Sequence, residues 1–455
     1  MYAAGLDPRV CMNDPEGSHP TQPQVRPISR ASLAVAAFST VVEWYDFTLY
    51  LYLTTVLSRV FFGPGAASLG ATLAAFAIAY LMRPLGAVVF GHVGDRLGRR
   101  WALLSSMLLM TLALLATGLL PTRAQVGSLA GWLLIGLRCL MGFSVGGEYN
   151  GVVAYLLEGS PPRRRGLIAA CAAAMSEVGG LLAAGVAALT VNAVSPAALD
   201  AWGWRIPFLF GALLATGVWI ARTSMQESPD FERQQAEGAT PQKPLRHILT
   251  QHWRGVLRAF AISALGSITY YVGITYVPAF LSSAGAIDER AALRLSTIAA
   301  LVVILVTPVV GALSDRLGRK PVLIVLGLLS AIAPVTMFAF MASGSPLRAL
   351  VGAVVLAAVA GGVSAVGAVT TAEQFPGEGR LTGLALGATA ATALFGGVAP
   401  YLAHVLMIRT GSPLVPGVMI AATALFVLPV LATLRETTPG RSSTANVIVM
   451  RQKSP

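Results

Sequence analysis

The sequence has little charge and few cysteines for its 455 residues. Only 11% of the residues are Asp, Glu, Lys or Arg, whereas soluble domains carry about a quarter. This is too little charge to cover a water-soluble globule of this size, which excludes an ordinary soluble enzyme. The three cysteines, Cys11, Cys139 and Cys171, show neither metal-ligand spacing nor a disulfide framework. Because HExxH, Walker A and Cys/His motifs are also missing, we expect no cofactor and no metal.

The net charge of +12 does not indicate a nucleic-acid partner. Basic residues lie in short loops between apolar blocks and form no single patch or stripe. This distribution is better explained by orientation in a lipid bilayer.

The apolar residues, 55% of the chain, fall into long blocks. Most blocks reach the ~20 residues that a helix needs to cross the hydrocarbon core, and spans must be helical because open strands leave their backbone unpaired in lipid. The sequence therefore predicts an all-α polytopic membrane protein with twelve transmembrane helices in two six-helix bundles. The predicted spans are 31–54, 66–91, 101–120, 127–157, 167–194, 204–222, 254–283, 291–313, 320–341, 346–372, 381–407 and 413–434.

The distribution of Lys and Arg predicts that both termini are cytoplasmic. With the N-terminus inside, 23 of the 32 basic residues fall in cytoplasmic segments or the span ends next to them, seven in external loops or the span ends next to them, and two deep within helices. We expect a multi-pass protein of the cell (inner) membrane. The predicted order is a cytoplasmic tail (1–29), a first bundle (30–222), a central cytoplasmic loop (223–253), a second bundle (254–436) and a cytoplasmic tail (437–455).

One loop sequence occurs in both halves of the chain. GHVGDRLGRR at 91–100 recurs as GALSDRLGRK at 311–320. Two parallel six-helix repeats with a site at their interface are the arrangement that alternating access uses.

The chain resembles the major facilitator superfamily in these two loops. Four further stretches resemble its metabolite:proton symporter family, whose members carry di- and tricarboxylates, 2-oxoglutarate, shikimate, or proline and betaine. They are EWYDFTLY (43–50), LMRPLGAVVFGHVGDRLGRR (81–100), GFSVGGEYNGVVAYLLEGSPPRRRG (142–166) and WGWRIPFLFGALL (202–214) with ESPDF (227–231). The chain departs from the family pattern at Met141 and in AACAAAM (169–175), on helices that line the site in such porters, so the substrate itself is not fixed.

The resemblance implies that the repeated loops gate the transporter. Asp95 and Asp315 are expected to join a charge network between helices that locks one access state. A solvated, positively charged loop is the alternative. The expected gating residues are Asp95, Arg96, Arg99, Arg100, Glu148, Asp315, Arg316 and Arg319.

Ionisable residues inside predicted spans are candidates for proton coupling, because each costs at least ~2.5 kcal/mol to insert. Glu43 and Asp46 share one face of the first helix. From the rise per residue, Asp46 lies ~22 Å and Arg138 ~28 Å from the cytoplasmic helix ends. We therefore expect Asp46 and Arg138 to meet and to couple proton movement to transport, with Glu43 nearby. A static ion pair that only sets helix packing is the alternative.

Other residues are candidates for the substrate site and the gate. Arg83 suits a carboxylate, unless it pairs with Glu43 or Glu148 or reaches the interface. Glu148 is either a structural partner or a gating residue, and Glu177 either tunes the substrate or neutralises an arginine. The expected substrate-binding residues are Arg83, Arg138, Glu177, Tyr270, Tyr271 and Tyr276; an interfacial aromatic belt is the alternative for the outer tyrosines.

Together these features predict a proton-coupled importer of a small organic acid. Its partners would be that anion, protons and the bilayer, with no nucleic acid, and it would work as a monomer. A porter of a zwitterionic osmolyte such as proline or betaine is the first alternative. A non-transporting sensor and a membrane enzyme are weaker alternatives, since charges in helices 1, 2 and 4 are intact and no catalytic motif occurs.

Overall fold

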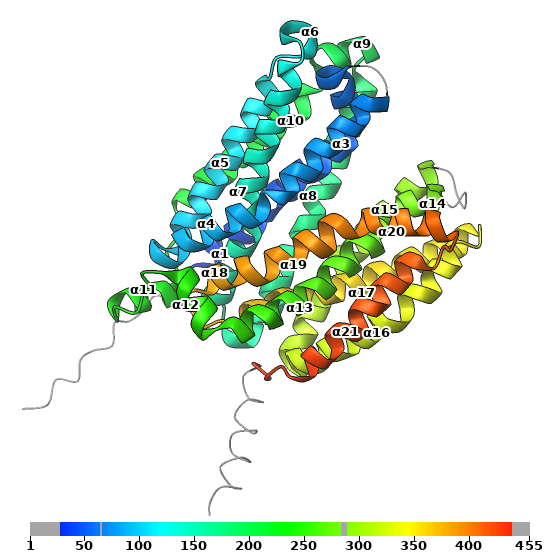
Figure 1. Cartoon of the computed structure of the whole chain (residues 1–455). Coiled ribbons are helices and arrows are strands. Elements are labelled where there is room, and N and C mark those ends of the chain that lie inside the picture. Colours follow the sequence, from blue (N-terminus) through cyan, green and yellow to red (C-terminus); the bar gives the residue numbers. More distant parts are fainter. Residues whose placement is uncertain (1–27, 64–65, 284–288, 439–455) are drawn as a thin grey trace, which may run out of the picture.

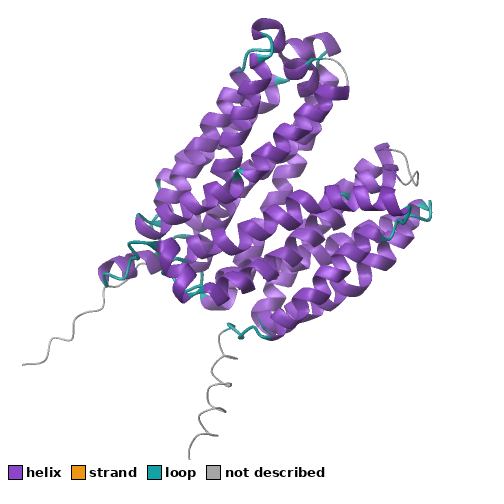
Figure 2. Ribbon diagram, viewed as in Figure 1, coloured by secondary structure: helices purple, strands orange, loops and turns teal. Residues whose placement is uncertain are grey.

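The computed structural model describes residues 28–63, 66–283 and 289–438. Most of both predicted tails, residues 1–27 and 439–455, therefore lies outside the described residues. Within the described ranges the chain is helical, and short loops connect the helices (Figure 2). Eleven helices of these ranges are long and apolar enough to cross a membrane. The helix α1 (Arg30–Tyr52) is not among them, but its 23 residues are long enough to complete a set of twelve.

The first bundle contains six spanning helices. The second of them is divided at Met82, because Arg83 and Pro84 begin a new helix. The six are α1, α3 (Ala66–Leu81) with α4 (Arg83–Arg96), α5 (Arg99–Leu119), α7 (Leu129–Gly159), α8 (Arg165–Ala193) and α10 (Arg205–Thr223). Short elements join them: α2 (Thr54–Leu57), η1 (Ser58–Phe62), α6 (Arg123–Val126), η2 (Pro162–Arg164), α9 (Pro196–Ala198) and η3 (Leu199–Gly203).

The second bundle contains helices with wider, π-helical turns. The seventh span consists of α13 (Trp253–Tyr270), η4 (Tyr271–Thr275) and α14 (Val277–Ser283). The eleventh consists of α18 (Arg380–Leu384), η5 (Ala385–Thr389), α19 (Ala390–Thr392), η6 (Ala393–Val398) and α20 (Ala399–Thr410). The others are α15 (Glu289–Leu317), α16 (Arg319–Met341), α17 (Pro346–Ala372) and α21 (Val415–Ala432). Two short helices, α11 (Pro229–Ala236) and α12 (Pro244–Gln251), connect the bundles.

The two bundles approach each other at one end and diverge at the other (Figure 1). We call the end with α11, α12 and α18 the converged end, and the end with α6, α9 and α14 the splayed end. Each bundle has its own apolar core, and a further cluster joins them with Leu157 on one side and Phe375 and Leu381 on the other. Many large apolar side chains are exposed, among them Phe426 at 80%. Such a surface is suited to lipid contact.

Glycines allow the fourth and second spans to cross closely. A Cβ at Gly146 of α7 would overlap the carbonyl oxygen of Arg83, and one at Gly142 would overlap that of Ala79. Small residues at such crossings let helix backbones touch in a membrane protein. This crossing holds Arg83 against α7 and so positions part of the site described below.

We predict that Gly146→Ala lowers the stability of the folded protein, because the added methyl group pushes α4 away from α7. Overpacking of this kind costs about 1–3 kcal/mol. The matched control is Gly136→Ala on the same helix, where a Cβ meets nothing within 4 Å. The check is the thermal unfolding midpoint of each purified variant in detergent; equal midpoints for the two variants would contradict the close crossing.

Candidate functional site

A cavity of about 180 Å³ lies between the bundles and is lined by both of them. Glu43, Arg83 and Glu177 come from the first bundle, and Tyr270 and Tyr271 come from the second. A cavity of this size is smaller than the ~300 Å³ at which drug-sized pockets begin, so it is suited to a small solute. Further polar and aromatic side chains of its wall are Trp44, Tyr149, Asn150, Ser176, Ser263, Ser267, Thr371, Thr389 and Thr392.

Arg83 is the basic residue of the cavity wall. Its Nη1 atom lies 3.8 Å from Oε1 of Glu43, and its guanidinium lies 4.5 Å from the ring centre of Tyr80. The other oxygen of Glu43 and the Nε1 atom of Trp44 are buried and have no hydrogen-bond partner. Buried polar atoms nearly always have a hydrogen-bond partner. Because both residues line the cavity, a bound solute can provide the partner that these two atoms lack.

Glu177 and Tyr270 face each other across the cavity. The hydroxyl of Tyr270 on α13 donates a hydrogen bond of 2.5 Å to Oε1 of Glu177 on α8. Within the described ranges, no Lys, Arg or His lies within ion-pair distance of Glu177. Tyr80 and Tyr271 form a second contact between the bundles, with 2.8 Å between their hydroxyl oxygens.

Asp46 and Arg138 form a buried ion pair next to this cavity. Nη1 of Arg138 lies 2.9 and 3.0 Å from the two carboxylate oxygens of Asp46, and both residues are 3% exposed. Nη2 of Arg138 donates to the hydroxyl of Thr117 at 3.1 Å. Helices α1 and α7 thus bring Asp46 and Arg138 together, as the similar heights of the two residues in their predicted spans led us to expect.

A second, smaller cavity of about 30 Å³ separates the two charge pairs. Its wall includes both Glu43 with Arg83 and Asp46 with Arg138. This volume is sufficient for one water molecule, and the wall offers polar partners to such a water. Glu43 and Arg83 also line the larger cavity, so the small cavity beside Asp46 shares two residues with it.

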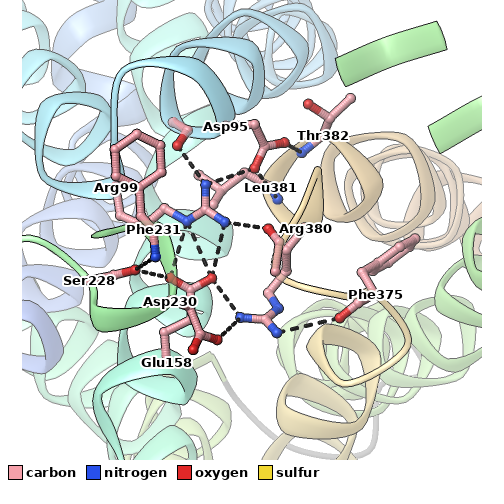
Figure 3. Close-up of polar contacts among 12 residues, drawn as sticks. Asp95, Arg99, Glu158, Ser228, Asp230, Phe231, Phe375, Arg380, Leu381 and Thr382 are labelled. Atoms are coloured by element: carbon pink, nitrogen blue, oxygen red, sulfur yellow. Dashed lines mark hydrogen bonds and ion pairs between the residues drawn. The ribbon is translucent and has the colours of Figure 1, made fainter. Parts of the chain in front are cut away.

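A charge network joins the bundles at the converged end (Figure 3). Arg99 pairs with Asp95 at 2.9 Å and with Glu158 at 3.1 Å, all within the first bundle. Glu158 also accepts a hydrogen bond of 2.6 Å from Arg380 of the second bundle. Each of these four side chains is at most 8% exposed. Exposed ion pairs contribute little, whereas breaking a buried network leaves an unpaired charge.

Backbone groups of α18 extend this network. The carboxylate of Asp95 accepts from the N–H groups of Leu381 and Thr382, at 3.3 and 2.8 Å (Figure 3). A carboxylate at a helix N-terminus satisfies free N–H donors and interacts favourably with the helix dipole. The segment after α10 also takes part, since Ser228 donates to Glu158 and Asp230 lies 3.4 Å from Arg380.

The second copy of the repeated loop makes the corresponding contacts. Asp315 accepts from the N–H groups of Gly166 and Leu167 at the start of α8, both at 2.9 Å. Arg319 pairs with Asp315 at 2.8 Å and lies 3.5 Å from Glu373. Each bundle therefore holds the N-terminus of a helix of the other with an aspartate from its repeated loop.

A glutamate beyond each bundle caps the helix that follows each repeated loop. Glu227 accepts from the backbone N–H groups of Arg99 and Arg100, and Glu436 accepts from those of Arg319 and Lys320. Burial raises the pKa of Glu227 above its ordinary value. Burial acts in the same direction on Glu436, but the N–H donors outweigh it and hold the pKa of that carboxyl below its ordinary value.

Glu148 lies inside the first bundle, away from the contact between bundles. Its carboxylate pairs with Arg222 of α10 and accepts a hydrogen bond of 2.8 Å from Ser106. Arg222 also donates to Ser39 of α1. Of the two roles that the sequence left open for Glu148, this geometry fits the structural partner.

Arg138, which was expected to bind the substrate, lines only the smaller cavity. Besides Arg138 and Glu148, three of the expected site residues lie elsewhere. Tyr276 does not line the cavity; it packs in the core of the second bundle, because its hydroxyl contacts Nδ1 of His404 at 3.2 Å. Arg96 and Arg316 are exposed and form no ion pair with any described residue. The network instead uses Arg99 and Arg319, while Arg100 contributes its backbone N–H and donates to the carbonyl of Thr223 at 2.5 Å.

Sequence reasoning did not identify Glu158, Arg222 and Arg380 as site residues. Glu158 and Arg380 lie next to the ends of predicted spans, where charges are ordinarily solvated. The internal repeat offered a signal, because Glu158 and Glu373 close corresponding helices and Arg165 and Arg380 open the next ones.

Comparison with known proteins supports the same fold. Residues 33–442 match the family model described as "Sugar (and other) transporter". The chain belongs to this family of the major facilitator superfamily. It is 33% identical over 430 residues to the ectoine/proline transporter of Corynebacterium glutamicum, covering 91% of this chain and 84% of that protein. It is 32% identical over 371 residues to the alpha-ketoglutarate permease of Escherichia coli, covering 81% and 85%.

Solved structures of the superfamily have the same architecture. A structure of the proton:xylose symporter XylE bound to 6-bromo-6-deoxy-D-glucose has a TM-score of 0.76 and 18% identity, and covers 90% of this chain and 96% of that one. The partially occluded, inward-open structure of the xylose transporter XylE from E. coli has a TM-score of 0.64 and 20% identity. The match covers 90% of this chain and 98% of that one. This protein is thus a multi-pass membrane transporter and not an enzyme.

We predict that Glu158→Gln loosens the converged end, because Arg380 and Arg99 lose their shared buried carboxylate. Breaking a buried pair costs about 3–5 kcal/mol, enough to change which arrangement of the bundles dominates. Spin labels at the exposed positions Arg96 and Arg316 should show a longer distance in this variant. Arg233→Gln, which removes an exposed partner of Asp230, is the control and should leave the distance unchanged; a distance that is equally unchanged in Glu158→Gln would refute the locking role.

Proposed function

We propose that the protein is a proton-coupled importer of a small zwitterion of the proline, betaine or ectoine type. The charge balance of the cavity wall is the observation that supports this proposal. Arg83 provides one cationic group, whereas Glu43 and Glu177 provide two carboxylates. A zwitterion matches such a wall, since its carboxylate can bind Arg83 while its cationic nitrogen faces acids and aromatic rings.

The relatives favour this alternative over the organic acid that the sequence led us to expect. The C. glutamicum relative is named for ectoine and proline, and other relatives are named proline/betaine transporters. A dicarboxylate would bring two negative charges to a wall that already has two carboxylates and one arginine. An organic acid is the second candidate, because Arg83 suits a carboxylate and one relative is an alpha-ketoglutarate permease.

Proton coupling in this proposal centres on Asp46. Arg138 stabilises the ionised form of a carboxylate, and loss of that partner in a buried site favours the protonated form. A solute carboxylate that binds Arg83 draws this positive charge away from Glu43. The small cavity, which Asp46 and Arg138 also line, then has less positive charge at its wall, and this favours the protonated form of Asp46. Solute and proton then load together, with Glu43 between the cavity and Asp46.

The membrane potential supplies enough energy for uptake against a gradient. One proton that enters down ~100 mV contributes about 2.3 kcal/mol. This corresponds to roughly fiftyfold accumulation of a solute that carries no net charge.

Alternating access in this proposal uses the converged end as one gate. The two aspartate contacts and the Glu158–Arg380 pair lock that end while the bundles diverge at the other. We infer from the positive-inside bias that the converged end, where α1 begins and α21 ends, faces the cytoplasm. The described arrangement then faces the outside, and inward opening requires the network to break.

We predict that Asp46→Asn abolishes uphill accumulation but retains solute exchange in proteoliposomes, because the amide cannot take up and release the coupling proton. The assay compares labelled proline or betaine uptake driven by an inward proton gradient with counterflow in its absence. Asp200→Asn is the matched control: Asp200 pairs with Arg59 at 2.8 Å, but the pair is exposed. Full accumulation by Asp46→Asn would remove the coupling role, and accumulation of dicarboxylates alone by the wild type would favour the second candidate.

A further inference from the structure

We infer that Glu177 binds the cationic nitrogen of the solute and thereby selects zwitterions over anions of the same shape. The inference rests on the proposed function and assigns one end of the solute to a residue. It starts from an imbalance among the buried carboxylates. Glu43 pairs with Arg83, Asp46 pairs with Arg138, and Glu148 and Glu158 each pair with arginines. Glu177 is 7% exposed, yet no described cationic side chain lies within ion-pair distance of it.

A buried carboxylate without a cationic partner is costly in a membrane protein. Tyr270 provides one hydrogen bond to Oε1 of Glu177, but a hydroxyl carries no compensating charge. Because Glu177 lines the cavity, a cationic group of the solute can supply the positive charge that compensates its carboxylate. The position is therefore suited to an ammonium group and unsuited to a second carboxylate.

The surroundings of Glu177 point to a substituted ammonium group. The rings of Trp44 and Tyr270 lie 5.4 Å apart, edge to face, and both residues line the cavity with Glu177. Aromatic faces next to a carboxylate are the usual recognition element for methylated or cyclic ammonium groups, which are weakly hydrated and bind the ring faces. Arg83 remains on the same wall for the solute carboxylate.

The same geometry ties solute binding to both bundles. Glu177 belongs to α8 of the first bundle, and Tyr270 belongs to α13 of the second. An ammonium group that binds Glu177 beside the ring of Tyr270 contacts both sides of the interface. Solutes that lack the cation lose this contact, so they are expected to bind less tightly.

The test compares pairs of solutes that differ only in the cationic nitrogen. Glycine betaine and 3,3-dimethylbutanoate have the same shape, as nearly do proline and cyclopentanecarboxylate. Dissociation constants of the purified, full-length protein are measured for each pair by titration calorimetry. For the wild type we expect the zwitterion of at least one pair to bind about 10- to 100-fold more tightly than its carbon analogue.

Glu177→Gln should reduce that ratio to near one, whereas Glu177→Asp should retain most of it. If the amide variant is not recovered folded, Glu177→Thr replaces it. Cys171→Ser, on the same helix but outside the cavity wall, is the control and should keep the wild-type ratio. An unchanged ratio in Glu177→Gln overturns this inference alone. A wild type that binds neither zwitterion overturns the proposed function as well.

Discussion

The structure depends on the need to pair charge inside a membrane. Each buried carboxylate or guanidinium is costly unless an opposite charge or several hydrogen bonds compensate it. In this chain the pairs Asp46–Arg138 and Glu148–Arg222 hold helices of the first bundle together, and Glu158–Arg380 joins the two bundles. The Glu158–Arg380 pair thus stabilises the arrangement in which the bundles meet at the converged end. If either residue takes another partner, that arrangement loses stability.

The two halves differ in their charged groups although one loop sequence occurs in both of them. The charged groups of the cavity and the Asp46–Arg138 ion pair lie in the first bundle, whereas the second offers Tyr270, Tyr271 and small hydroxyl residues. The contacts of the two repeated loops are nearly symmetric, with Asp95 and Asp315 at the N-termini of α18 and α8. A symmetric gate suits rocking of two similar bodies, while an asymmetric cavity suits a solute with two different ends.

Much of the fold could be predicted from the sequence, because apolar length and the positive-inside rule are strong signals. The all-α fold with two six-helix bundles is confirmed, and the heights of Asp46 and Arg138 predicted their contact. The π-helical turns in the seventh and eleventh spans could not be predicted, since one extra residue barely alters hydrophobicity. The Glu158–Arg380 pair was missed because it joins distant segments at span ends, and Tyr276 was misplaced because His404, its partner, comes from another helix.

In the function we propose, solute binding changes the protonation of Asp46. Titration calorimetry with the bound solute in buffers of different ionisation enthalpy measures the number of protons taken up per solute. The coupling role of Asp46 predicts the uptake of about one proton per solute in the wild type and of none in Asp46→Asn. Equal proton uptake in the two proteins, or none in either at any pH, would contradict it.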